Sequence, residues 1–123
     1  MHIFHKQKSN NMQTVYCKQY KAVTFALALI KSELVKKIQF DEKLDCDFND
    51  IDYCLQAQKA GYEIWYTPYA QAVHCESHTR KGMGMAGKKE NYDYFKGKWM
   101  DVTNKIGLDL HEINTMIARK VTQ

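Results

Sequence analysis

The 123-residue sequence has a single proline, Pro68, and only four cysteines, none of them spaced as a Cys-x-x-Cys pair. It also lacks a long apolar run, since the longest, residues 22–30, includes a threonine. A membrane-spanning helix needs about 20 apolar residues, so no stretch is a candidate for one or for a signal peptide. Because disulfide frameworks need regularly paired cysteines, we expect reduced thiols in a cytoplasmic protein, acting either in solution or at the cytoplasmic face of the membrane.

Composition indicates one globular domain. Hydrophobic residues make up 45% of the chain and charged residues 26%, and the net charge of +4 is mildly basic. Such a charge favours anionic partners. The 18 Lys and Arg are spread along the chain without a recognised binding motif, so we expect no nucleic-acid partner. The glycines do not have the spacing of a P-loop, which excludes an NTPase of that class.

Local patterns predict alternating strands and helices. The apolar run 22–30 is typical of a buried strand, although periodicity alone leaves a helix open. Ser32 is positioned to cap a short helix, and Asp47 or Asn49 to cap a second one that ends at Gly61. The predicted strands are 15–20, 22–30, 63–67 and 69–75, and the predicted helices are 33–38, 49–60, 90–106 and a last one from 109.

Chemically reactive side chains are concentrated between residues 39 and 80. Asp50 and Asp52 lie in the first turn of the predicted helix 49–60, where a carboxylate favours the helix dipole whatever its function. Two metal-site hypotheses also arise. Residues 45–47 form an Asp-x-Asp, a pattern common by chance, and a zinc site would draw on His74, Cys75 and His78, whose spacing on an extended segment rarely lets ligands converge.

Five blocks of this stretch match one family in order and spacing. They are Phe40-Asp41-Glu42, 48–55 (FNDIDYCL), Ala60-Gly61-Tyr62, 66–70 (YTPYA) and His74-x-Glu76-Ser77-x-x-Arg80, followed by Phe95-x-x-Lys98-Trp99. Together they resemble the second half of the catalytic domain of family 2 glycosyltransferases, a group that includes bacterial rhamnosyltransferases. The resemblance covers residues from about 22 to 99. Ile38 and Gln39 replace two glycines that the family carries before the first block.

The resemblance implies an α/β fold: the second half only of the GT-A (nucleotide-diphospho-sugar transferase) fold, with extra C-terminal helices. Residues 1–21 would be a lead-in segment and 22–87 the acceptor and catalytic half. A basic, glycine-rich loop would occupy 78–89, and helices would fill 88–123. The family's first half, a nucleotide-binding unit with its own metal-binding acids, has no counterpart in the sequence.

The resemblance also implies a function, namely part of an inverting glycosyltransferase that moves a sugar from a nucleotide-sugar donor to a hydroxyl acceptor, such as a glycan. Asp50 would be the catalytic base and His74 a ligand of a divalent metal, Mn²⁺ or Mg²⁺, in the complete enzyme. Arg80 would contact the donor phosphate, and Asp52 and Trp65 would be structural or acceptor-site residues. The expected partners are a separate nucleotide-binding half or a second copy of this chain. The alternative is a non-catalytic, dimeric interaction module that retains the half-fold.

Overall fold

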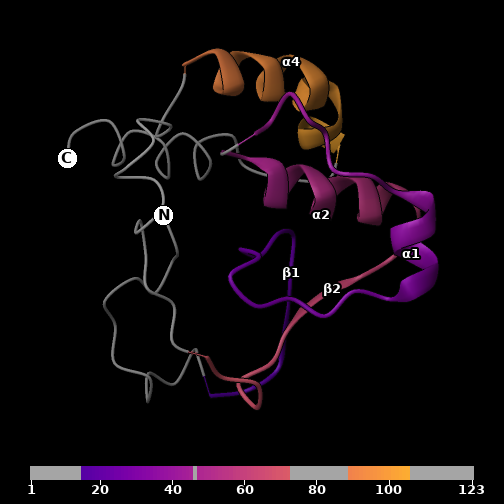
Figure 1. Ribbon diagram of the computed structural model, residues 1–123, viewed down its shortest axis with the longest axis vertical. Coiled ribbons are helices and arrows are strands. Elements are labelled where there is room, and N and C mark those ends of the chain that lie inside the picture. The colour runs from indigo at the N-terminus through magenta and orange to yellow at the C-terminus, as the bar shows by residue number, and fades with distance from the viewer. Residues whose placement is uncertain (1–14, 46, 73–88, 106–123) are drawn as a thin grey trace.

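The computed structural model describes residues 15–45, 47–72 and 89–105, with the backbone alone for 101–105. Within these residues the chain forms two strands and three helices, namely β1 (Lys18–Tyr20), α1 (Ser32–Lys37), α2 (Asn49–Lys59), β2 (Ile64–Tyr66) and α4 (Lys89–Lys105). Helix α2 lies in the middle, with α4 on one side and the two strands on the other (Figure 1). The mixed α/β character predicted from the sequence is therefore confirmed.

The sheet consists of β1 and β2 paired antiparallel, with Tyr20 opposite Ile64 and Lys18 opposite Tyr66. Tyr20 and Tyr66 meet edge to face, with their ring centroids 6.3 Å apart. Such aromatic cross-strand contacts stabilise short strand pairs. Both predicted strands, 15–20 and 63–67, are confirmed, each in a shorter form.

Two hydrophobic clusters hold the elements together, and α2 contributes to both. The first joins α2 to α4 and to the loop before α2, through Leu44, Leu55, Phe95 and Trp99. The second joins α2 to α1 and reaches the strand side, through Leu34, Ile38, Tyr53 and Ala57, with Tyr62 and Ile64 packed against them. Because one helix supplies apolar residues to both clusters, its position determines how the rest of the described chain packs.

The predicted helix caps are wrong, although the helices are confirmed. Helix α2 begins after Phe48, whose φ of 68° lies in the left-handed region, and no side chain caps it. The Asn49 side chain instead accepts the Asp50 N–H at 2.8 Å. Similarly, Ser32 is the first residue of α1, and its N-cap is Lys31. In each case the N-cap is a residue whose side chain makes no capping hydrogen bond.

The apolar run 22–30 does not form the predicted buried strand. It contains a turn at 25–26, and Leu29 is fully exposed while Leu27 is 58% exposed. Phe25 and Ile30 pack against the second cluster and anchor the two ends of the exposed part. A strand needs main-chain partners on a neighbouring strand, and none of the described residues supplies them to this segment.

The predicted strand 69–75 is also corrected where the structure describes it. Residues 69–72 form no strand, and Tyr69 is exposed. The remainder of that segment, the lead-in up to residue 14, residues 78–88 of the predicted loop 78–89 and the predicted last helix lie outside the described residues. Lys89, the last residue of that loop, is instead the first residue of α4. Among the helices that are described, none combines the length and the apolar character needed to cross a membrane.

Substitution of alanine for two of the glycines should change the free energy of unfolding in opposite directions. Gly61 ends α2 with φ of +86°, and Gly97 lies inside α4; an added Cβ meets no atom within 4 Å at either position. We expect Gly61→Ala to lower the free energy of unfolding by about 1–2 kcal/mol, because only the backbone conformation is strained. Gly97→Ala should raise it by about 0.5–1 kcal/mol, since alanine costs less helix entropy. Urea unfolding of both variants checks this, and a stabilising Gly61→Ala would contradict the left-handed conformation.

Candidate functional site

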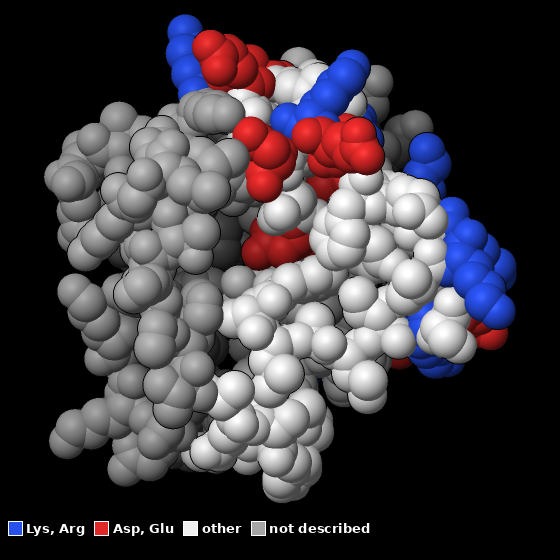
Figure 2. Space-filling view, in the orientation of Figure 1, with Lys and Arg blue, Asp and Glu red and all other residues white. Residues whose placement is uncertain are grey.

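Acidic side chains gather around the start of α2. On the face shown in Figure 2, Asp and Glu cluster near the N-terminal end of this helix, whereas lysines line the edge where α1 lies. The acids of this region come from α2 itself and from the loop that precedes it: Asp41, Asp45, Asp47, Asp50 and Asp52. Their local environments differ sharply, and the differences indicate which carboxylate can act on a ligand.

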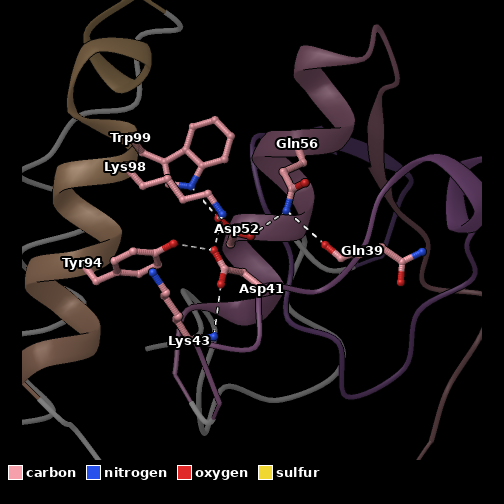
Figure 3. Close-up of polar contacts among 8 residues, drawn as sticks. All are labelled: Gln39, Asp41, Lys43, Asp52, Gln56, Tyr94, Lys98 and Trp99. Carbon is pink, nitrogen blue, oxygen red and sulfur yellow. Dashed lines mark hydrogen bonds and ion pairs between the residues drawn. The ribbon is translucent and has the colours of Figure 1, made fainter.

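Asp52 is fully buried and is held by three side-chain donors (Figure 3). Its Oδ1 accepts the indole N–H of Trp99 at 2.7 Å and lies 2.8 Å from Lys98 Nζ. Its Oδ2 accepts the Gln56 side-chain amide at 2.7 Å. A carboxylate removed from water is tolerated only when donors replace the lost hydration. Two of the three donors come from α4, so this helix supplies most of the compensation.

Lys98 joins this buried carboxylate to a second one. Its Nζ lies 2.6 Å from Asp41 Oδ2, which also accepts the Tyr94 hydroxyl at 2.8 Å. The Lys98 hydrogen bond is the largest of several effects that lower the pKa of Asp41 to about 2. Partial burial opposes the charge of Lys98, but its bonds to Asp41 and Asp52 raise its pKa overall. Lys98 and Asp41 therefore stabilise each other in their ionised forms.

Asp50 is placed differently. It lies in the first turn of α2, is half-buried, and accepts the Ile51 N–H on Oδ1 at 2.8 Å. The structure thus brings the two predicted acids, Asp50 and Asp52, into one helical turn and gives them different surroundings: one is enclosed by donors from α4 and the other remains partly accessible.

The other predicted site residues are dispersed. Trp65 is on β2, 57% exposed, and its indole N–H donates to Glu63 at 2.8 Å. Tyr66, the next residue of β2, packs on Tyr20, and adjacent residues of a strand point to opposite faces. His74 and Arg80 lie outside the described residues.

The metal-site hypotheses find no support in the described part of the chain, where no group of three His, Cys, Asp or Glu side chains is placed to hold an ion. Asp45 accepts the Asn91 amide at 3.1 Å, and Asp47 is buried. His74, Cys75 and His78 of the zinc hypothesis lie outside the described residues. Burial raises the pKa of the Cys54 thiol to about 11, so this cysteine is not poised as a nucleophile.

A wide groove of about 610 Å³ lies elsewhere on the surface. It is lined by residues of β1, of the C-terminal part of α2 and of the start of β2, including Tyr20, Gln58 and Tyr62. None of the five acids near the start of α2 lines it. The groove is therefore separate from the site.

Sequence reasoning missed the contribution of α4 to this site. Asp41 and the Lys98-Trp99 pair were recognised only as matching blocks, without a role. One signal was available, because Trp99 follows Phe95 by four residues on the apolar face of a predicted helix. A tryptophan buried on such a face needs an acceptor for its N–H, but the sequence does not say which residue provides it.

Comparison with known proteins adds one relative. The "Uncharacterized protein y4gI" of Sinorhizobium fredii (strain NBRC 101917 / NGR234) is 35% identical over 86 residues, which are 65% of this chain and 10% of that protein. The chain thus spans about a tenth of the length of this relative. No family model and no solved structure matches the chain.

The depressed pKa of Asp41 predicts a pH dependence. The value of about 2 lies below the ordinary 3.8, so ionised Asp41 stabilises the fold above pH about 4, and this contribution is lost as the pH falls towards 2. We expect Asp41→Asn to be less stable than the wild type at pH 7, and the difference to shrink between pH 4 and 2. Urea unfolding across this range measures it, with Glu42→Gln, an exposed neighbouring acid, as control. A difference independent of pH would contradict the ion pair.

Proposed function

We propose that this chain is the acceptor-side, catalytic part of an inverting glycosyltransferase with a GT-A type fold, which transfers a sugar from a nucleotide-sugar to a hydroxyl group. The proposal rests on the resemblance to family 2 glycosyltransferases and is supported by the contrast between two acids of α2. Asp52 is buried, while Asp50, two residues earlier, is half-buried and accepts only a hydrogen bond from the adjacent Ile51 N–H among the contacts described.

That contrast carries the assignment of the catalytic base. A general base needs an ionised carboxylate within hydrogen-bond reach of the acceptor hydroxyl. Asp52 is enclosed by Trp99, Lys98 and Gln56, so no acceptor can reach it without displacing a donor. Asp50 is half-buried, so it remains partly accessible, and it lies in the first turn of α2, where the positive end of the helix dipole favours a nearby carboxylate.

The chemistry follows from this placement. Asp50 takes the proton of the acceptor hydroxyl as its oxygen attacks the anomeric carbon of the donor. The new carbon–oxygen bond forms on the face of the sugar opposite the nucleoside diphosphate. The bond between the sugar and the nucleoside diphosphate breaks, and the nucleoside diphosphate leaves with the electron pair of that bond. A carboxylate on a rigid helical turn keeps the hydroxyl aligned for this attack.

The remaining residues have supporting roles in this proposal. Trp65 offers an exposed ring on which an acceptor sugar can stack. Arg80 would contact the donor phosphate, and His74 would complete the coordination of Mn²⁺ or Mg²⁺ in the complete enzyme. That ion would offset charge on the leaving diphosphate. The donor-binding half would come from another polypeptide segment, and the reaction would take place in the cytoplasm or at its membrane face.

A second candidate function is favoured by the exposed apolar surface. Leu29 is fully exposed, and Leu27, Phe40, Trp65 and Tyr69 are at least half exposed. Exposed apolar side chains indicate a protein contact where they form one continuous patch. The alternative is therefore a non-catalytic module that pairs with a second copy of the chain. Sedimentation of the wild type and of Leu29→Lys decides it: a dimer that the substitution dissociates would favour the module.

Substitution of the two acids should separate catalysis from stability. In a polypeptide that joins this stretch to a donor-binding half, we expect Asp50→Asn to lower turnover by about 10²- to 10⁴-fold with little change in melting temperature. Asp52→Asn should lower turnover less and the melting temperature more, because it weakens a buried ion pair. Turnover and thermal unfolding of both variants provide the comparison. The reverse ranking would identify Asp50 as a structural acid.

The isolated 123-residue chain should show no measurable transfer, because positioning of the donor contributes much of the rate acceleration. If it retains donor contacts, UDP- or dTDP-sugars with Mn²⁺ should raise its melting temperature, since a ligand that binds only the native state stabilises it. Thermal unfolding with a panel of nucleotide-sugars and with Mn²⁺ alone measures this. Robust transfer by the purified chain would overturn the expectation, and the absence of any shift would favour the interaction module.

A further inference from the structure

We propose that Lys98 and Trp99 of α4 are positioning residues for Asp50 and act through Asp52. This inference rests on the proposed function, because it takes Asp50 as the catalytic base. The proposed chemistry does not otherwise involve α4. The contacts that give this helix a role lie on both sides of Asp50 in the sequence.

The first observation is the spacing of the two acids. Successive residues of an α-helix are rotated by about 100°, so side chains two positions apart point to nearly opposite sides. Asp52 points to α4, where it meets Trp99 Nε1 and Lys98 Nζ. Asp50 therefore points away from α4. Contacts that hold Asp52 fix the rotation of the turn, and with it the direction of Asp50.

The second observation is the strained entry into α2. Phe48, two residues before Asp50, has φ of 68°, a left-handed conformation that is unfavourable for a bulky side chain. Its ring stacks on Phe95 of α4 at a centroid distance of 5.1 Å and also lies 6.2 Å from Tyr92. Such a conformation persists only where the surrounding packing holds it.

Asp50 is thus flanked by two attachments to the same helix: the Phe48 ring on one side and the Asp52 carboxylate on the other. Lys98 also binds Asp41 at 2.6 Å, which ties the preceding loop to α4. Loosening α4 releases the first turn of α2 at both points. The contacts with α4 therefore fix the direction in which the carboxylate of Asp50 points.

Amide hydrogen exchange in the 123-residue chain tests this without any activity. The Ile51 N–H donates to Asp50 Oδ1, so its protection reports the orientation of that carboxylate, whereas the Tyr62 N–H donates to Ala57 O at the far end of α2. We expect Lys98→Met and Trp99→Phe to accelerate exchange at Ile51 by about tenfold or more, since each removes a hydrogen bond to a charged group. Exchange at Tyr62 should change much less.

Lys96→Met is the matched control, because Lys96 is an exposed lysine on the same helix. It should leave both amides as in the wild type. Trp99→Phe keeps most of the aromatic packing and removes only the indole donor, so the test remains available if Lys98→Met does not fold. Equal acceleration at Ile51 and Tyr62, or none at Ile51, would overturn the positioning role.

Turnover separates this inference from the function on which it rests. In a transfer-competent polypeptide that contains this stretch, Trp99→Phe should lower kcat by about tenfold and leave the donor KM unchanged. Asp50→Asn should then cost less in the Trp99→Phe background than alone, because the base is already misaligned. If Asp50→Asn alone has no effect, the proposed function fails; if it has a large effect while Trp99→Phe has none, only the positioning role fails.

Discussion

The burial of the Asp52 carboxylate is the constraint on which the described structure depends most. A charged group without access to water must be surrounded by donors, and here two of them, Trp99 Nε1 and Lys98 Nζ, belong to α4. The first hydrophobic cluster, which includes Leu55 and Phe95, forms between the same two helices. Apolar packing brings α4 against α2, and the carboxylate then determines in which register and at which rotation they meet.

The same arrangement gives the acids at the start of α2 different roles. Asp52 and Asp41 both pair with Lys98, and these contacts hold α2 and the loop before it against α4. Asp50 takes no part in that network and remains half-buried. A carboxylate that acts on a ligand needs this combination of a rigid support and an open side. The proposed glycosyl transfer needs a carboxylate with a rigid support and an open side, and so would any other reaction that uses a positioned carboxylate.

The sequence predicted the regular elements well wherever their signals are local. Helix α2, its end at the left-handed Gly61, strand β2 and helix α4 follow from apolar spacing and from one glycine. The buried strand at 22–30 was wrong, because apolar character indicates burial but does not provide a neighbouring strand. The helix caps were wrong for a related reason: Phe48, whose ring packs on α4, takes a position that local propensity assigns to a polar residue.

What the sequence by itself determined is therefore the position of Asp50 in the first turn of a helix, since apolar periodicity and a terminal glycine are properties of neighbouring residues. Which of the two acids in that turn is buried was decided only by the tertiary structure. Asp52 and Trp99 are 47 positions apart. The hydrogen bond between them forms because the apolar faces of two helices pack together, and no local pattern encodes that pairing.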